Sequence, residues 1–189
     1  MKIDFTHAVT EHHKAIESVL EQSDKVTQVV ERILNSIAQG GKVIWLGNGG
    51  SAADAQHMAA ELMVRYIKNR QPIASLALTT DSSILTAHSN DFHFDTVFSR
   101  QIQGLAKPED VIIAMSTSGN SPNVINAVAV ANKIGCFTVA MTGQTSSQLS
   151  AIAQICFQIN TQETARAQEA HSFINHLICE GLDSVYEEE

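Results

Sequence analysis

Apolar residues recur at two different periods along the chain, and the period changes near residue 40. In the first forty residues apolar positions repeat every three to four residues, with a restart at Ser23 and Asp24, which predicts two successive helices that end at Gly40 and Gly41. Beyond residue 42, short continuous apolar runs alternate with stretches of helical period. These runs predict five strands, at 43–46, 73–78, 111–115, 137–141 and 155–159.

The stretches between these runs predict helices, and together the elements define a fold class. Helical patterns cover 51–68, 82–90, 94–105, 121–134 and 146–152, and a last one covers about 163–186. The strands do not alternate cleanly, which is typical of strands buried on both faces. Strands that alternate with helices form parallel sheets with right-handed crossovers. We therefore predict a three-layer α/β/α sandwich with a central parallel sheet of about five strands.

The length fits a single domain over residues 1–189. Residues 1–40 are then an N-terminal helical extension. We assign this extension to oligomer packing, and the alternative is that it covers the sheet of its own chain.

Composition and charge narrow the classes of function. There are 20 acidic and 12 basic residues, a formal net charge of −8, which argues against a general nucleic-acid surface but not against a local site for a small anion. The 3 cysteines show no CxxC or other metal-type spacing, so a reduced cytosolic setting is favoured over a disulfide framework. We find neither a run of 18 apolar residues nor the apolar core of a signal peptide, and we expect a cytoplasmic protein without a membrane span.

Two Gly- and Ser-rich loops each follow a predicted strand and open a predicted helix. The first reads GNGGSA at 47–52, and its three glycines let backbone N–H groups approach a ligand, although a plain tight turn has the same composition. The second reads STSGNSP at 116–122, with Ser121 at the expected N-cap and Pro122 at the first helical position. Its four hydroxyls converge near the positive end of a helix dipole. The two loops predict a phosphate cradle that needs no Lys or Arg.

Polar residues form a stripe on the helix after the first loop. Asp54, His57, Glu61 and Arg65 are spaced by three, four and four residues. His57 and Glu61 can therefore reach one metal ion or one substrate, although a solvated polar face shows the same spacing. On the last helix His176 lies within a nearly apolar turn, where it is either a functional group or a buried histidine with a structural partner.

These segments together resemble the sugar isomerase (SIS) domain family and, within it, the phosphoheptose isomerase branch. The resemblance spans nearly the whole chain, and its motifs are GNGGSAADAQHMAAEL at 47–62, NDF at 90–92, STSGNS at 116–121 and ARAQEAH at 165–171, followed by His176. It implies an aldose–ketose isomerase that converts sedoheptulose 7-phosphate to D-glycero-D-manno-heptose 7-phosphate through an enediol(ate). This reaction is the first step toward ADP-heptose and the lipopolysaccharide core.

The resemblance also implies residue roles and an assembly. It implies a cytoplasmic homotetramer with sites at subunit interfaces, with neither nucleic acid nor membrane as a partner. One zinc ion per subunit is expected on His57, Glu61, Gln168 and His176. The implied substrate contacts are Asn48, Gly49, Gly50, Ser51, Asn90, Asp91, Ser116, Thr117, Ser118, Ser121 and Gln168. A carboxylate and an imidazole suit carbonyl transfer between C1 and C2, so we predict Glu61 as the base and His176 as its acid/base partner.

Two alternatives to this isomerase stay open. A non-catalytic relative that associates with the bacterial replication initiator shares both loops but lacks a carboxylate and an imidazole where this chain has Glu61 and His176. An isomerase of another phosphosugar is the second alternative. Ala165 stands where some isomerases carry an acidic residue, which leaves any role of that carboxylate in doubt.

The predicted zinc set also contains a geometric tension. Gln168 and His176 are eight residues apart, about 12 Å along a regular helix. Long side chains, a distorted start of the helix, or ligands from two chains would each resolve it.

Overall fold

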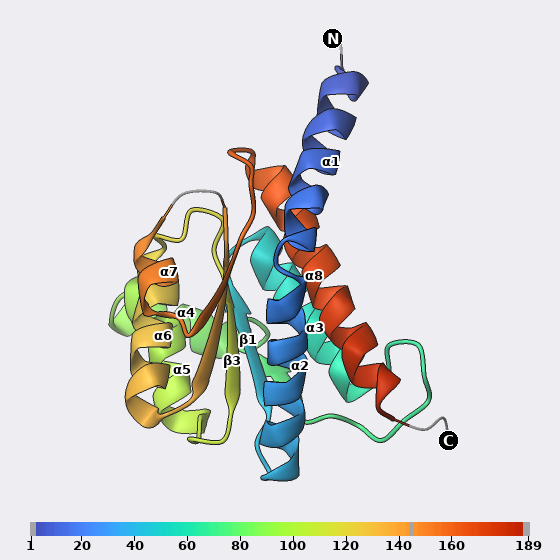
Figure 1. Cartoon of the computed structure of the whole chain (residues 1–189). Coiled ribbons are helices and arrows are strands. Elements are labelled where there is room, and N and C mark those ends of the chain that lie inside the picture. Colours follow the sequence, from blue (N-terminus) through green and yellow to red (C-terminus); the bar gives the residue numbers. More distant parts are fainter. Residues whose placement is uncertain (1–2, 144–145, 187–189) are drawn as a thin grey trace.

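A computed structural model describes residues 3–143 and 146–186 (Figure 1). The predicted fold class is confirmed: five parallel strands form one sheet in the order β2-β1-β3-β4-β5, between two layers of helices. The elements in chain order are α1 (Phe5–Leu20), α2 (Ser23–Ala38), β1 (Val43–Gly47), α3 (Gly50–Met63), β2 (Ser75–Ala77), α4 (Ser82–Asp91), the 3-10 turn η1 (Phe94–Thr96), α5 (Val97–Leu105), β3 (Val111–Met115), α6 (Pro122–Ile134), β4 (Phe137–Thr142), α7 (Gln148–Ile152), β5 (Ile155–Gln158) and α8 (Thr164–Ser184).

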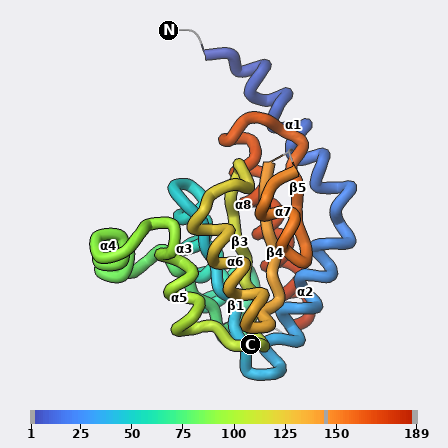
Figure 2. Tube along the Cα trace, turned by 90° about the vertical axis from the view of Figure 1, so that its left-hand side faces the viewer, coloured from blue at the N-terminus to red at the C-terminus, as the bar shows by residue number. Residues whose placement is uncertain are grey.

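The two faces of the sheet are covered by different helices. α1, α2, α3 and α8 lie on one side, and α4 to α7 lie on the other (Figures 1 and 2). In β1, Val43 and Trp45 pack with the first group, while Ile44 and Leu46 pack with the second. All four side chains are fully buried, which explains why the strand sequence shows no polar alternation.

The register of the sheet brings the two predicted loops together. β1 and β3 are neighbours in the sheet, and the chain leaves β1 for α3 on one face and β3 for α6 on the other. Gly47, the last residue of β1, lies opposite Met115, the last residue of β3. The loops that follow these residues are therefore neighbours at the carboxyl edge of the sheet, at the point where α/β sheets bind ligands.

The N-terminal extension partly covers its own chain. Ala15 and Val19 of α1 and Ile33 of α2 are buried in the core with α8. The outer face of α1 stays exposed, with Phe5 at 71% and Val9 at 53% exposure, and this helix projects from the body (Figure 2). Its part in oligomer packing stays a prediction. Within the described ranges no helix is both long and apolar enough to span a membrane.

α3 ends at Met63, five residues before the predicted end at 68, and a buried arginine explains the difference. Arg70 Nη1 donates to Leu62 O (3.0 Å), Nη2 donates to Glu61 O (3.1 Å), and Nε donates to Asp183 Oδ1 (2.7 Å). Arg70 thus satisfies the last carbonyls of α3 and turns the chain back toward α8. Arg65 lies beyond the helix, so its predicted place on the polar stripe is wrong and the stripe ends at Glu61.

The ion pair of Arg70 and Asp183 yields a prediction for stability. Both side chains are nearly inaccessible to solvent, and Asp183 Oδ2 also accepts the backbone N–H groups of Ile67 and Lys68. Asp183→Ala leaves the guanidinium buried without a counter-charge, so we expect a loss of about 3–5 kcal/mol in the free energy of unfolding, measured in urea. As a control, Lys14→Ala removes an exposed pair with Glu11 and should change it by less than about 0.5 kcal/mol.

The same pair fixes the direction of a pH effect. Burial by itself would raise the pKa of the Asp183 carboxyl, but hydrogen bonds from Lys68, Arg70 and Ile67 outweigh it and hold the pKa below its ordinary value of 3.8. The ionised Asp183 carboxylate therefore stabilises the folded state fully above pH 3.8, and this stabilisation is lost as the pH falls through the lowered pKa. The stability difference between wild type and Asp183→Asn should stay constant above about pH 5 and shrink below about pH 4. A difference that grows in acid would contradict this account.

Candidate functional site

Three serine hydroxyls gather at the start of α6. Ser121 takes the N-cap position with Pro122 after it, as predicted, but its side chain makes no capping hydrogen bond. Instead Ser116 Oγ donates to Ser121 Oγ (3.0 Å), and Ser118 Oγ lies 3.5 Å from Ser116 Oγ. The hydroxyls therefore face one another at the positive end of a 13-residue helix, where a phosphate is favoured.

The backbone of this second loop is held by neighbouring segments. The carbonyl of Thr117 accepts the N–H of Gly143 (2.9 Å), and Gly119 O accepts the N–H of Leu149 (3.0 Å). Gly119 has φ +65°, and an added Cβ there would overlap the side chain of Ser147. Glycine is thus required at this position both by the backbone and by the close approach of α7.

The first loop contacts α8 through the side chain of Gln168. A Cβ added to Gly50 would lie 2.7 Å from Gln168 Nε2, so this amide can lie directly against the backbone because residue 50 is glycine. Ser51, the next residue, is buried, and Asn48 reaches across to the second loop, where it hydrogen-bonds Asn123. The predicted substrate contacts of the first loop, the second loop and Gln168 therefore form one neighbourhood at the carboxyl edge of the sheet.

α3 and α8 pack side by side and run in the same direction. Gly50 faces Gln168, Asp54 accepts hydrogen bonds from Ser172 Oγ (2.9 Å), and the ring of His57 contacts the ring of His176. Each contact joins residues about 118 positions apart, so the register holds over two turns. It places the two loops at one end of this helix pair and the histidines farther along it.

The second part of the site is a cluster of His57, Glu61 and His176. His57 Nε2 lies 3.1 Å from Glu61 Oε1, and the rings of His57 and His176 meet edge to face with centroids 5.2 Å apart. The ring of Tyr66 stacks on the ring of His176, with centroids 5.7 Å apart. Burial, and then the negative charge of Glu180, raises the pKa of the Tyr66 hydroxyl, so this ring stays neutral. Tyr66 was not predicted at the site, because its place beyond α3 depends on the turn at Arg70.

The residue types of this cluster fit a zinc site, but their arrangement in one chain does not. Two imidazoles and a carboxylate are ligands that zinc prefers. Among residues 3–143 and 146–186, however, no three His, Cys, Asp or Glu side chains are arranged to hold a metal ion. Gln168 lies about 12 Å along α8 from His176, and α8 is helical from Thr164, which excludes a distorted start around Gln168. The zinc ligand set stays a prediction, and long side chains or ligands from two chains are the alternatives that remain.

Asn90 and Asp91 lie apart from these groups. They end α4, which packs on α5 and η1 and projects from the body in Figure 2. Within the described residues their side-chain amide and carboxylate hydrogen-bond only each other (2.8 Å). The structure of a single chain does not bring them to either loop, and their predicted role in substrate binding stays a prediction.

The buried histidine of α8 is His171 rather than His176. His171 is fully buried, whereas His176 is only partly buried, so the expectation of a buried His176 is wrong. Burial lowers the pKa of His171 to about 4, although a hydrogen bond to Thr142 O (3.2 Å) opposes the shift. The neutral ring links α8 to the end of β4 beneath the second loop. Helical period alone could not show which histidine faces the sheet.

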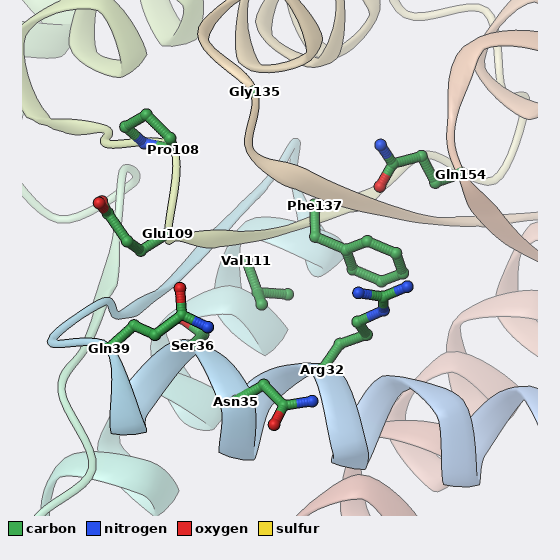
Figure 3. A pocket seen from close by; sticks show the side chains of 10 residues that line it. All are labelled: Arg32, Asn35, Ser36, Gln39, Pro108, Glu109, Val111, Gly135, Phe137 and Gln154. Atoms are coloured by element: carbon green, nitrogen blue, oxygen red, sulfur yellow. The ribbon is translucent and has the colours of Figure 1, made fainter.

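A separate hollow of about 480 Å³ lies at the opposite, amino edge of the sheet (Figure 3). The guanidinium of Arg32 lies over the ring of Phe137, 5.0 Å from its centroid, and Glu109 stands across from it. α2 and α6 both end beside this hollow. The partial negative charge of these helix ends and the Glu109 carboxylate make the binding of a phosphate there unfavourable. This hollow therefore gives no reason to move the predicted phosphate cradle from the carboxyl edge.

Comparisons with known proteins agree with the fold. Residues 4–143 match the model of the SIS domain family. A probable phosphoheptose isomerase of Thermoplasma acidophilum is 45% identical over 163 residues, which cover 86% of this chain and 90% of that protein. The phosphoheptose isomerase of Paramagnetospirillum magneticum is 46% identical, over 84% of this chain and 82% of that one. The solved structure of a phosphoheptose isomerase from Neisseria gonorrhoeae superposes with a TM-score of 0.88 at 38% identity, covering 95% of this chain and 96% of the other.

The close approach of Gly50 and Gln168 gives a prediction. In Gly50→Ala the new Cβ displaces the end of a flexible side chain, so we expect a small change in Tm but a clear shift of the Gln168 side-chain amide resonances in NMR spectra. The matched control is Gly104→Ala, where an added Cβ meets no atom within 4 Å and the Gln168 resonances should stay in place. Unshifted Gln168 resonances in Gly50→Ala would contradict the contact.

Proposed function

This chain belongs to the SIS domain family and, within it, to the phosphoheptose isomerases, and from that premise we propose that it converts sedoheptulose 7-phosphate to D-glycero-D-manno-heptose 7-phosphate. The observation that carries the proposal is the contact of Glu61 with His57, with His176 beside them. A phosphosugar-binding protein without catalysis has no need of a carboxylate and two imidazoles at this place. The phosphate end of the substrate would bind the hydroxyls of Ser116, Ser118 and Ser121.

The proposed chemistry is a proton transfer between neighbouring carbons. Glu61 takes a proton from C1 of the ketose, the electron pair of the C1–H bond forms a C1–C2 double bond, and the π pair of the C2 carbonyl moves onto O2 to give an enediol(ate). A carbonyl then forms at C1 as O1 gives up its proton, and the electron pair of the double bond takes a proton returned to C2, which gives the aldose. His176 moves the hydroxyl proton between O1 and O2, so no atom is gained or lost. The imidazole of His57 hydrogen-bonds Glu61 and holds its carboxylate in place.

We further propose that His57, Glu61, Gln168 and His176 hold one zinc ion per subunit. When bound, zinc would polarise the substrate oxygens and stabilise the negative charge of the enediolate. Glu61 is a weaker base while it ligates a metal, so the proposal requires that it does both only in turn. His57 then has a second purpose, because it can keep the carboxylate oriented when the metal does not.

The proposed site combines two chains. Glu61 follows Gly50 by eleven residues, about 16 Å along α3, so in one chain the base lies far from the loops that would hold the phosphate. We propose that the loops and Gln168 of one subunit face His57, Glu61 and His176 of another, within a homotetramer. The exposed outer face of α1, with Phe5 and Val9, supports such an assembly. We place the enzyme in the cytoplasm, where its product would feed the synthesis of ADP-heptose and the lipopolysaccharide core.

The catalytic assignment predicts a specific kinetic defect. Glu61→Gln and His176→Gln each remove one proton-transfer group while the shape is nearly kept, so we expect kcat to fall by about 10²–10⁴-fold. Sedoheptulose 7-phosphate should still bind, because the hydroxyls of the second loop are intact, and calorimetry measures this. Full activity in either variant, or the absence of turnover in wild type, would overturn the proposal; the latter is what a non-catalytic initiator partner predicts. Turnover of a different phosphosugar would favour the second alternative, an isomerase of another substrate.

The same preparations test zinc. We expect about one zinc per chain in the wild type, loss of activity with a chelator, and recovery when zinc is added. His176→Gln should lower the zinc content, whereas Asn126→Ala, on the far layer, should not. Unchanged activity after complete removal of metal would refute the metal-assisted form of the mechanism.

A composite site predicts complementation between inactive variants. Ser116→Ala/Ser118→Ala disables the loops and Glu61→Gln disables the base, so each variant alone should be inactive. When the two are unfolded together and refolded, mixed tetramers contain some sites with both wild-type halves, and activity should return to a measurable fraction of wild type. Each variant refolded alone is the control. If mixing restores nothing although mixed tetramers form, the site lies within one chain.

A further inference from the structure

Two asparagine side chains join the two loops by a reciprocal pair of hydrogen bonds. Asn48 Nδ2 donates to Asn123 Oδ1 (2.9 Å), and Asn123 Nδ2 donates to Asn48 Oδ1 (2.8 Å). Asn48 begins the first loop, while Asn123 is the second residue of α6, directly beyond the second loop. Asn123 is 2% exposed and Asn48 is partly exposed, so the buried amide supports one that reaches the surface of the site.

A backbone group decides which way both amides face. The N–H of Val124 donates to Asn123 Oδ1 (3.0 Å), and a backbone N–H can only donate. The oxygen of Asn123 is thereby fixed toward Val124 and Asn48, and its NH₂ group toward the oxygen of Asn48. Turning Asn48 over would set NH₂ against NH₂ and oxygen against oxygen. The orientation of Asn48 is thus determined by the start of α6.

The pair leaves Asn48 with unused hydrogen-bonding capacity. A side-chain amide has two N–H donors and two oxygen lone pairs. The bridge to Asn123 uses one of each, so one N–H and one lone pair remain on Asn48. Asn48 belongs to the first loop, which lies beside the second loop and contacts the Gln168 amide at Gly50, and we expect the carbon chain of a bound sugar phosphate to run there.

We propose that Asn123 is a positioning residue for the sugar part of the substrate, which acts by fixing the orientation of the Asn48 amide. The inference rests on the proposed function, since it takes a sugar phosphate as the ligand. Asn123 itself does not touch the substrate. A donor and an acceptor in fixed places next to the phosphate cradle recognise a sugar hydroxyl, which can both accept and donate a hydrogen bond.

A double-mutant cycle tests the inference. The dissociation constants of sedoheptulose 7-phosphate and of inorganic phosphate are measured by calorimetry for wild type, Asn48→Ala, Asn123→Ala and the double variant. We expect each single variant to bind the sugar phosphate at least tenfold more weakly, and the double variant to bind it no more weakly than Asn48→Ala, within about twofold. The affinity for inorganic phosphate should stay within about twofold of wild type in the three variants, because the serine hydroxyls of the second loop are unchanged.

A merely structural role of Asn123 gives a different result. If Asn123 only supports the first turn of α6, Asn123→Ala weakens inorganic phosphate and sugar phosphate alike, and its effect multiplies with that of Asn48→Ala; either outcome overturns the proposal. Asn123→Ser repeats the cycle if the alanine variant does not fold. The matched control is Asn126→Ala, on the same helix, whose amide donates to Asp95 O (2.8 Å) and which should bind like wild type.

Turnover separates this inference from the proposed function. In an active wild type, Asn123→Ala should raise KM more than it lowers kcat, because the Asn48 contact holds substrate and transition state alike. If wild type binds the sugar phosphate without turnover, the proposed function fails, and the binding cycle still decides the inference. If wild type binds no sugar phosphate, both are refuted.

Discussion

The parallel packing of α3 against α8 is the constraint on which the arrangement of the site depends. Contacts at both ends fix the register: the Gln168 amide lies against Gly50 at one end, and Asp183 holds Arg70 at the other. A slip of one helix along the other by a turn would also break the contacts of Asp54 with Ser172 and of His57 with His176. The distance between the loops and the His57 cluster is therefore a property of the fold, and mobile side chains cannot remove it.

The pairing of β1 with β3 in the sheet supplies the second constraint on the site. β1 and β3 are neighbours in register, so the loops that follow them are adjacent whatever their sequences. The sequences then decide what those loops present: glycines where α8 approaches, and hydroxyls where α6 begins. Because Ser121 does not cap its helix in the usual way, its hydroxyl stays with Ser116 and is free to meet a ligand. The first turn of α6 thus lacks a side-chain cap at the place where a phosphate could accept hydrogen bonds from its backbone N–H groups.

The features that depend on local sequence were predictable, and those that depend on distant partners were not. The strands are short apolar runs, and Ser121 with Pro122 marks the start of α6, so the fold class and both loops followed from the pattern. The end of α3 did not, because it is set by Arg70 and by Asp183, which lies 113 residues farther along the chain. Likewise the pattern could not tell that His171 faces the sheet, or that Asn123 pairs with Asn48. Helical period gives the spacing of a face but not the neighbour it meets.

The composition of the second loop determines how phosphate binding at the proposed site would depend on ionic strength and pH. Residues 116–121 contain neither Lys nor Arg, and they offer hydroxyls and a helix end in place of a formal charge. Ionic strength screens the attraction between full charges over about 10 Å, whereas short hydrogen bonds to neutral groups are little affected by it. Serine hydroxyls do not change their ionisation near neutral pH, so the ligand's own second ionisation, near pH 6, dominates the pH response of this cradle. With such a loop, a protein of net charge −8 could hold the proposed anion without an opposite formal charge at the site.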